Sequence, residues 1–466
     1  MKKTLLIFLQ LLLLNTANSQ VFDVQNIQYK GDPNKFINIV IMGDGYTVNE
    51  QATFVTKATD LTNYLFSQVP WSNYKNYFNV YAIKVISNES GAKHPNNLAD
   101  CGSVPNANPD NYLGSSFDNF GIHRLIIANN TSHITSVLSA NFPNYDQVIV
   151  IANTPYYGGS GGGYATITAN VSSNEIFAHE IGHTAGVLAD EYYAGDQYFA
   201  EKLNMTQQSS PALIKWKNWL TTPQIGINVY GTSGIANTWF KPTSNTCKMQ
   251  ALGNPYCSVC KEALIEKIHF ATNPIVNYTP VNIATINSPS QLLDFNLTEL
   301  MKPIPNTLSI KWQLDSNVFN TNLENFQVDQ FLLSNGNHTL TATVVDEATL
   351  VKTDNHNTIH FSTVTWTIQK NNLGINTISE SNQIGISIYP NPSIDKLNIE
   401  VNLEKSSNLS IELIDLNGKI IETIPNQEVS EGKNINSFNV SKLAAGNYII
   451  VAKINGANYS KIFVKE

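Results

Sequence analysis

The chain has 466 residues, enough for about three domains. Hydrophobic residues make up 42% and aromatic residues 10%, so the chain can build real cores and wholesale disorder is excluded. Charged residues make up only 14%, the formal net charge is -8, and Arg124 is the only arginine. This balance argues against a nucleic-acid-binding protein, which needs a basic face, and against docking on acidic membranes. A surface built from neutral Asn, Ser and Thr suits an extracellular protein.

Residues 1–19 have the parts of a secretory signal peptide in the right order. Lys2 and Lys3 form a basic start, and an apolar run follows that is too short to span a bilayer. The small residues Ala17-Asn18-Ser19 then provide a cleavage site before Gln20. We therefore expect export. No later apolar run reaches the about 18 residues of a membrane-spanning helix, so we expect no transmembrane segment.

Residues 20–280 alternate strand-like and helix-like segments, which is typical of an α/β layer fold. The continuous apolar run Val148-Ile149-Val150-Ile151 indicates a strand buried on both faces. Expected strands cover residues 36–42, 78–86, 124–128 and 147–152, and an expected helix covers residues 49–67.

The strongest chemical signal is the run His179-Glu180-Ile181-Gly182-His183. Histidines four positions apart lie on one face of a helix, about 6 Å along its axis, so both rings can reach one ion. Glu180 is not needed as a ligand but is placed to take a proton from a metal-bound water. The flanking residues are apolar, and a buried glutamate between two histidines needs a reason. The pattern predicts a catalytic zinc site.

A catalytic zinc needs three protein ligands and one open position. Gly186 can end the helix in a left-handed turn, so that the chain doubles back toward the metal. Asp190 is our predicted third ligand and Glu191 the second choice. Two alternatives stay open: Asp190 orients a histidine without binding the metal, or a distant glutamate, Glu262, is the ligand.

Four cysteines, Cys101, Cys247, Cys257 and Cys260, fall inside this region. An even number in an exported protein favours disulfides, with three connectivities possible. The spacing Cys257-x-x-Cys260 also fits half of a structural zinc site, but only Cys247 is near and no fourth ligand is evident.

Two all-β segments follow. Alternation of apolar and polar residues with period two predicts an immunoglobulin-like β-sandwich over residues 281–370. Residues 371–385 are polar and form an expected linker. Residues 386–466 predict a small β-sandwich of about seven strands, with Asn417-Gly418 as a hairpin turn.

The catalytic region resembles the IgA-peptidase family of metzincin-like zinc metallopeptidases over about residues 30 to 275. The resemblance rests on the HExxH run, Gly186 and Ala189-Asp190-Glu191-Tyr192, and on three further motifs: Met42-Gly43-Asp44-Gly45-Tyr46-Thr47, Glu89-Ser90-Gly91-Ala92 with His94-Pro95, and Cys247-Lys248-Met249 before Tyr256-Cys257-Ser258-Val259-Cys260. It departs from the usual metzincin pattern because Ala189 stands where that pattern has a third histidine. The resemblance implies zinc-dependent hydrolysis of peptide bonds but no particular substrate.

The same resemblance suggests roles for two more residues. Met249 could form the methionine turn that floors the zinc site in metzincins, with an ordinary core methionine as the alternative. Tyr192, or its neighbour Tyr193, could donate a hydrogen bond to the developing oxyanion. The glycine run at residues 158–163 could form a flexible rim, and the strand after it could pair with an extended substrate; an ordinary solvent loop is the alternative.

The last eighty or so residues resemble the C-terminal sorting domain of the type IX secretion system. The motifs are Tyr389-Pro390-Asn391-Pro392, Asp415-Leu416-Asn417-Gly418-Lys419, Leu443-Ala444-Ala445-Gly446-Asn447-Tyr448 and the near-terminal Lys465. This resemblance implies the type IX machinery as a partner and a secreted or cell-surface location.

The sequence therefore predicts a multidomain exported zinc endopeptidase: an α/β, metzincin-like peptidase domain, an Ig-like β-sandwich and an all-β sorting domain. Its expected substrates are extracellular proteins or glycoproteins, of immunoglobulin-like or mucin-like kind. The alternative is a surface adhesin or glycan-binding protein with an inactive metal site. The intact Glu180 argues against it, because a relict site has no need for the base.

Overall fold

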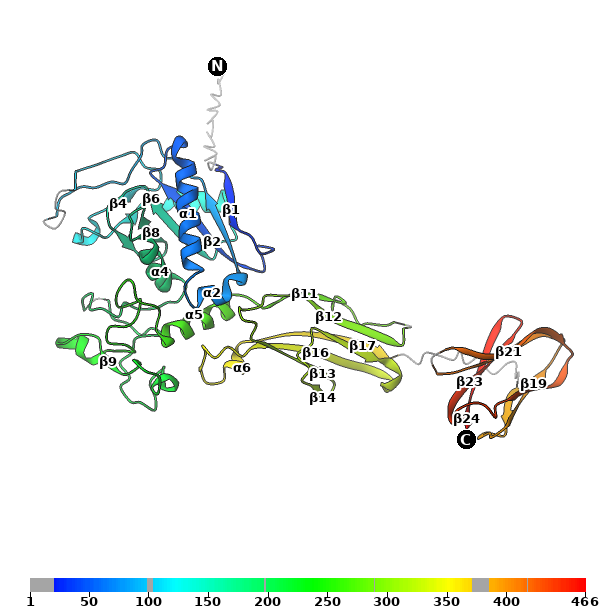
Figure 1. The fold of residues 1–466 in the computed structure, drawn as a ribbon. Coiled ribbons are helices and arrows are strands. Elements are labelled where there is room, and N and C mark those ends of the chain that lie inside the picture. The colour runs from blue at the N-terminus through cyan, green and yellow to red at the C-terminus, as the bar shows by residue number, and fades with distance from the viewer. Residues whose placement is uncertain (1–20, 99–103, 197, 289, 371–384, 417) are drawn as a thin grey trace, which may run out of the picture. The chain divides into compact units, whose positions relative to one another are not determined.

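The computed structural model describes residues 21–98, 104–196, 198–288, 290–370, 385–416 and 418–466. The predicted signal peptide, nearly all of the predicted linker and Cys101 lie outside these residues. The chain divides into two compact units, Met1–Asn371 and Asn372–Glu466 (Figure 1). Within the described residues, we find no helix with the length and apolar character needed to cross a membrane.

The first unit begins with a six-stranded mixed sheet in the order β1-β3-β2-β6-β8-β7. The four central strands are parallel, while the edge strands β1 and β7 run antiparallel to their neighbours. The strands are β1 (Val24–Gln28), β2 (Ile37–Asp44), β3 (Phe78–Ile83), β6 (Gln147–Ala152), β7 (Gly159–Ser160) and β8 (Ala165–Thr168). The strands expected at residues 36–42 and 147–152 are confirmed as β2 and β6.

Helices cover both faces of this sheet, because alternate residues of its strands are apolar on both sides. Ile39 and Ile41 share a core with α1 and α4, whereas Val40 and Met42 of the same strand share one with α3. The mixed α/β expectation is thereby confirmed. The helices are α1 (Gln51–Leu65), α2 (Trp71–Tyr74), α3 (Thr131–Asn141), α4 (Ser173–Thr184) and α5 (Ser258–Ala271).

Short strands and long loops complete this part. The two-stranded pairs are β4 (Ser115–Ser116) with β5 (Ile127–Ala128), and β9 (Asn228–Val229) with β10 (Phe240–Lys241). The strand expected at residues 124–128 is thus only two residues long.

Two antiparallel sheets follow α5 and enclose one core, in which Trp312 and Trp366 stack at a centroid distance of 5.8 Å. The sheet orders are β11-β12-β15 and β14-β13-β16-β17. The strands are β11 (Ile275–Thr279), β12 (Leu292–Leu300), β13 (Leu308–Leu314), β14 (Asn317–Phe319), β15 (Asn325–Asp329), β16 (Gly336–Asp346) and β17 (Phe361–Lys370), with the short helix α6 (His356–Ile359) before the last.

The buried carboxylate of Asp346, at the end of β16, ties these sheets to the α/β part. Its Oδ2 lies 2.9 Å from His269 Nε2 of α5 and also accepts a hydrogen bond from the Tyr74 hydroxyl of α2. Thr307 donates to its other oxygen.

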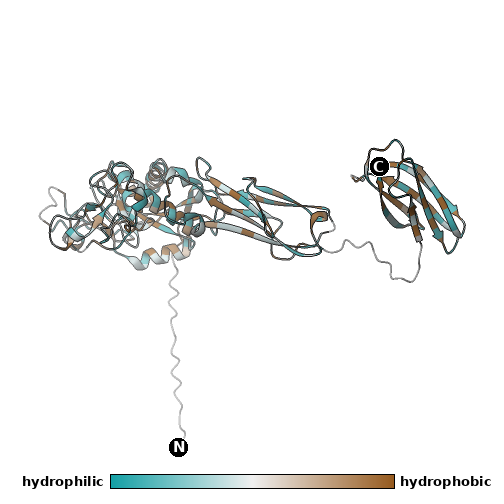
Figure 2. Ribbon diagram, turned by 90° about the horizontal axis from the view of Figure 1, so that it is seen from below, coloured by the Kyte–Doolittle hydropathy of each residue, from teal (hydrophilic) through white to brown (hydrophobic). Residues whose placement is uncertain are grey.

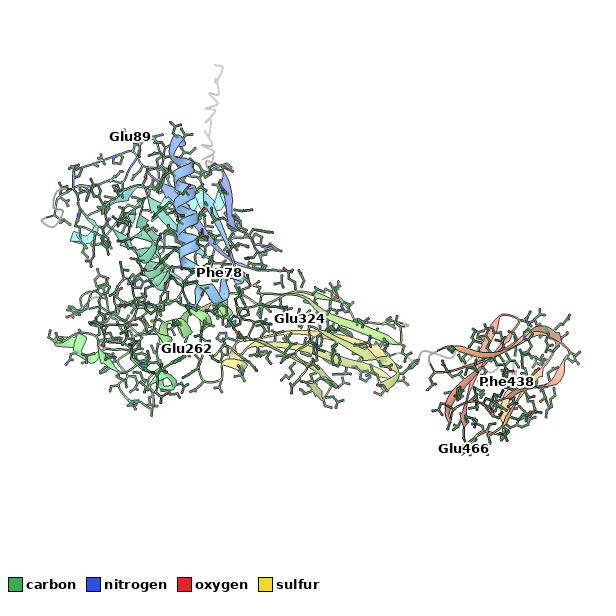
Figure 3. All side chains as sticks on the ribbon, in the orientation of Figure 1. Phe78, Glu89, Glu262, Glu324, Phe438 and Glu466 are labelled. Atoms are coloured by element: carbon green, nitrogen blue, oxygen red, sulfur yellow. The ribbon has the colours of Figure 1, made fainter. Side chains whose placement is uncertain are left out.

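The second unit consists of seven strands in two sheets, ordered β18-β19-β22 and β21-β20-β23-β24. Apolar and polar residues alternate along its strands (Figure 2), and the apolar set forms one core around Phe438 (Figure 3). The strands are β18 (Gly385–Tyr389), β19 (Lys396–Leu403), β20 (Ser407–Ile414), β21 (Ile420–Val429), β22 (Gly432–Asn439), β23 (Gly446–Ile454) and β24 (Ala457–Lys465).

Candidate metal centre

The apolar side of helix α4 is buried against the sheet and α1. The helix therefore directs His179, Glu180 and His183 toward the cavity on its other side. Glu175 in its first turn lies at the positive end of the helix dipole and forms an ion pair of 2.6 Å with Lys248 Nζ. Lys248 is 1% exposed. This contact fixes the segment around Lys248 against α4.

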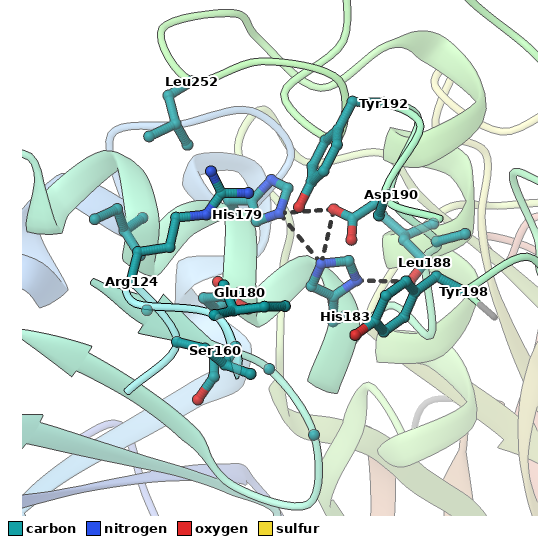
Figure 4. Close-up of a pocket in the computed structure, with 18 of the residues that line it drawn as sticks. Arg124, Ser160, His179, Glu180, His183, Leu188, Asp190, Tyr192, Tyr198 and Leu252 are labelled. Carbon is teal, nitrogen blue, oxygen red and sulfur yellow. Dashed lines mark hydrogen bonds and ion pairs between the residues drawn. The ribbon is translucent and has the colours of Figure 1, made fainter. Parts of the chain in front are cut away.

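Three ligand-type atoms converge at the end of α4 (Figure 4). His179 Nε2 and His183 Nε2 are 3.2 Å apart, and Asp190 Oδ1 lies 3.0 Å from the first and 3.3 Å from the second. Tetrahedral ligands about 2.05 Å from one ion would be about 3.3 Å apart. The three edges therefore match the triangular face of a metal site.

The Nδ1 atoms of both histidine rings form hydrogen bonds to backbone carbonyls. His179 Nδ1 lies 3.0 Å from the carbonyl oxygen of Lys248, and His183 Nδ1 lies 2.8 Å from that of Leu188. A carbonyl oxygen can only accept, so each Nδ1 carries the proton and a neutral ring turns a lone pair at Nε2 toward the centre.

Asp190 Oδ1 is buried and has no hydrogen-bond donor unless a histidine takes a second proton. Three lone pairs thus face one another, an arrangement that a cation satisfies. A cation is not the only way to satisfy these lone pairs, because a histidine can also take a second proton. Burial lowers the pKa of His183, but the hydrogen bond and charge of Asp190 outweigh burial and raise this pKa to about 9. The residues therefore fit a divalent metal.

The turn after α4 brings Asp190 to the histidines, but not as the sequence predicts. The residue in the left-handed region is Val187, with φ of 53°, and not Gly186. Gly186 is needed for close approach instead, because a Cβ there would lie 2.7 Å from the carbonyl oxygen of Gly182 and 2.8 Å from Leu264. The expected left-handed glycine is thus wrong, although the reversal of the chain occurs.

Glu180 is 8% exposed and lies against the glycine run. A Cβ on Gly159 would be 3.2 Å from one of its carboxylate oxygens, and a Cβ on Gly161 would be 2.9 Å from the other. Burial raises the pKa of Glu180, and the two neighbouring histidines oppose this rise. The carboxylate is therefore a stronger base than an exposed glutamate.

A cavity of about 920 Å³ opens above these residues and is lined by His179, Glu180, His183, Asp190 and Tyr192, among others. Tyr192 lies over His179, with ring centroids 6.4 Å apart and planes at 27°. Tyr193, by contrast, is 56% exposed and its hydroxyl donates to Asp196 at 2.8 Å. Of the two tyrosines, Tyr192 is the one that lies beside His179.

Met249 is fully buried beneath α4, where a Cβ on Gly182 would come within 2.8 Å of its sulfur. It follows Lys248, whose carbonyl accepts from His179, and its own carbonyl accepts from the backbone N–H of Glu191 at 2.7 Å. Met249 therefore lies under the helix turn that carries both histidines.

The two alternative ligands lie elsewhere. Glu191 is fully buried, but its carboxylate accepts from Thr243 Oγ1 at 2.5 Å and from Asn204 Nδ2 at 3.2 Å. Glu262 of α5 (Figure 3) accepts from Trp219 Nε1 at 2.7 Å and from the backbone of Lys352. Neither residue belongs to the group of His179, His183 and Asp190.

Two segments of the chain match models of known families. Residues 25–228 match the family described as IgA Peptidase M64, and residues 387–466 match the secretion system C-terminal sorting domain. The α/β part of the chain is therefore similar to the M64 peptidase family. The M64 family consists of metallopeptidases, and the sorting domain supports export by the type IX system to the cell surface or beyond.

Other comparisons add little. No curated protein matches this chain. Among solved structures, it is similar to dimeric latent PorU from Porphyromonas gingivalis (13% identity, 34% of this chain and 16% of that chain, TM-score 0.15). It is also similar to SGBP-B of the mixed-linkage glucan utilization locus of Bacteroides ovatus (15% identity, 40% and 46%, TM-score 0.15). The chain thus spans less than half of either structure, and TM-scores this low carry no inference about fold or activity.

The expected disulfides of the peptidase are not formed among its described cysteines. Cys247, Cys257 and Cys260 are free and buried, and Cys247 Sγ lies 3.6 Å from Cys260 Sγ. A disulfide needs about 2.05 Å. The turn before α5 brings the three thiols and the Glu191 carboxylate within 4.8 Å of one another, with no bonded pair among these cysteines.

Sequence reasoning also missed several parts of the site. Arg124 lines the cavity (Figure 4), although the sequence indicated only that it is the sole arginine. The carbonyls of Lys248 and Leu188 carry no sequence signal. The sequence indicated that the strand β8 could pair with substrate, but β6 lies along one of its edges and β7 pairs with Thr166 and Ile167 on the other.

Proposed function

We propose that the chain is an exported zinc-dependent endopeptidase that hydrolyses peptide bonds of extracellular proteins or glycoproteins. The observation that carries this proposal is the convergence of two imidazole lone pairs and one carboxylate oxygen beside a buried glutamate, at the base of a large cavity. His179, His183 and Asp190 would hold the metal and leave one position open.

A bound zinc ion would polarise the scissile carbonyl and make a water more acidic. Glu180 would take the proton from the attacking water and then pass it to the departing amine. The close approach of Gly159 and Gly161 to Glu180 supports this role, because it limits the positions that the carboxylate can take. Tyr192 would donate a hydrogen bond to the carbonyl oxygen as it gains charge; its position over His179 at the wall of the cavity supports this role.

We assign the parts of the chain as follows: a signal peptide at residues 1–19, a metzincin-like peptidase domain at 20–280, an immunoglobulin-like sandwich at 281–370, a linker at 371–385 and the sorting domain at 386–466. The assignment of the sandwich is supported by two sheets around one tryptophan-containing core. Immunoglobulin-like or mucin-like proteins are the proposed substrates.

The test is to incubate the purified protein with an unfolded polypeptide, with and without a chelator, and to identify fragments by mass spectrometry. We expect fragments with internal cleavage sites, their loss on chelation and their return when zinc is added. Absence of cleavage with metal bound would favour the other hypothesis, a surface adhesin or glycan-binding protein. The fragment ends would also give the cleavage preference.

A further inference from the structure

A second group of potential ligands lies behind the first and is fully within the protein. It consists of Cys247, Cys257, Cys260 and Glu191, whose ligand atoms all lie within 4.8 Å of one another. All four residues are buried. The cysteines lie beyond residues 25–228, the part of the chain that matches the peptidase family.

The spacing of these atoms is that of ligands around an ion. Cys247 Sγ is 3.6 Å from Cys260 Sγ, and Cys260 Sγ is 3.3 Å from Glu191 Oε1. Tetrahedral zinc with Zn–S of about 2.3 Å and Zn–O of about 2.0 Å gives edges of about 3.8 Å between sulfurs and about 3.5 Å between sulfur and oxygen. The observed edges are within 0.2 Å of these values.

The surroundings support bound thiolates. Cys257 and Cys260 stand at the start of α5, where the helix dipole favours negative charge. The backbone N–H of Cys257 points at Cys247 Sγ from 3.4 Å. Lys241 is buried nearby and donates to the backbone oxygen of Glu191, so a cation offsets part of the negative charge of the ligands.

We propose that Cys247, Cys257, Cys260 and Glu191 form a structural zinc site, separate from the catalytic one. Softness of the ligands favours zinc over magnesium or calcium. All four positions are supplied by the protein, which is the pattern of a structural site, whereas a catalytic site keeps one position open.

This site would clamp the three segments that build the catalytic centre. Glu191 directly follows Asp190, Cys247 directly precedes Lys248, and Cys257 and Cys260 begin the helix that packs behind α4. A metal bound there would fix Asp190 relative to the carbonyl that holds His179. We therefore infer that loss of this second metal weakens the catalytic site, although the second site does not itself contact substrate.

The test uses the full chain and counts metal rather than activity. Wild type should carry two zinc ions per chain by native mass spectrometry. The variant His179→Ala with His183→Ala should keep one zinc. Loaded with cobalt(II), this variant should show thiolate-to-cobalt charge-transfer absorption in the near ultraviolet.

Glu191→Gln in the same background should lower zinc affinity by more than the about 10–100-fold typical of an outer-shell residue. The proposal is overturned if the double-histidine variant binds no metal, if its cobalt spectrum lacks thiolate bands, or if peptide mapping finds any of the three cysteines in a disulfide. None of these results depends on the catalytic role of His179 and His183, since the variant removes that site. If wild type binds only the thiolate-bound ion and no metal at His179 and His183, the proposed function is contradicted and the second site is not.

Discussion

Asp190 is the residue on which the identity of the metal centre depends. The two histidines of an HExxH helix are set by spacing alone, whereas the third ligand comes from a turn whose course the spacing does not determine. In the structure its Oδ1 makes two contacts of 3.0 and 3.3 Å to the histidine nitrogens, while Glu191 turns the other way. The sequence favoured Asp190 over Glu191 as the third ligand, and Asp190 is the one that lies beside the histidines; its role as a ligand stays a prediction.

We expect Asp190→Ala to weaken zinc binding at the catalytic centre by more than about 100-fold, because a ligand is lost and not only its outer-shell support. Competition with a chromogenic chelator measures this affinity. Asp60→Ala, at an exposed position of α1, is the matched control and should bind zinc as wild type does. If Asp190→Ala binds zinc as tightly as wild type, Asp190 is not a ligand.

At the scale of elements, the glycine run packs closely on α4 and limits the space around Glu180, the proposed base. Gly159 belongs to β7 at the sheet edge, and Gly161 follows it directly over Glu180. The run therefore forms a wall beside Glu180 and lines the cavity.

Gly161→Ala should lower the rate of peptide hydrolysis by up to about 100-fold, because the new methyl group would lie 2.9 Å from a Glu180 carboxylate oxygen and 3.2 Å from the His183 ring. Gly163→Ala is the matched control, since a Cβ there meets nothing within 4 Å. Steady-state kinetics on one peptide substrate, with metal content measured in parallel, checks the prediction. Equal rates for the two variants would show that this wall does not position the base.

Local pattern predicted β2, β6 and the outline of α1, because their apolar periodicity reflects burial directly. It also predicted seven strands in the second unit, although β22 was not located, since its residues are largely exposed and polar. The local sequence pattern could not predict contacts between segments that are distant in the sequence. Glu191 joins cysteines that stand more than fifty positions away in the sequence, so no spacing rule could supply it as a fourth ligand.

At the scale of the whole molecule, Asp346 links the α/β part to the two β-sheets that follow it. Burial raises its pKa, but hydrogen bonds from His269, Thr307 and Tyr74 outweigh burial and hold this pKa below its ordinary value. A carboxylate with a depressed pKa stabilises the fold above its unfolded-state pKa of about 3.9. This contribution is lost as the pH falls through the folded-state value.

We therefore expect the free energy of unfolding to fall as the pH drops below about 4, and expect Asp346→Asn to flatten that part of the curve. At neutral pH the variant should be less stable by about 1–3 kcal/mol, because charge-assisted hydrogen bonds become neutral ones. Urea unfolding at several pH values measures both effects. Asp294→Asn, exposed on β12, is the control. An unchanged pH dependence in Asp346→Asn would contradict the assignment.

The most direct test of the central claim is the Glu180→Gln variant, assayed for zinc content and for peptide hydrolysis in the same preparation. The amide keeps the size of the side chain but cannot accept the proton, so zinc should remain at the wild-type level while hydrolysis falls by at least about 100-fold. Glu89→Gln, at an exposed glutamate (Figure 3), should keep full activity. Full hydrolysis by Glu180→Gln with zinc retained would contradict the proposed mechanism.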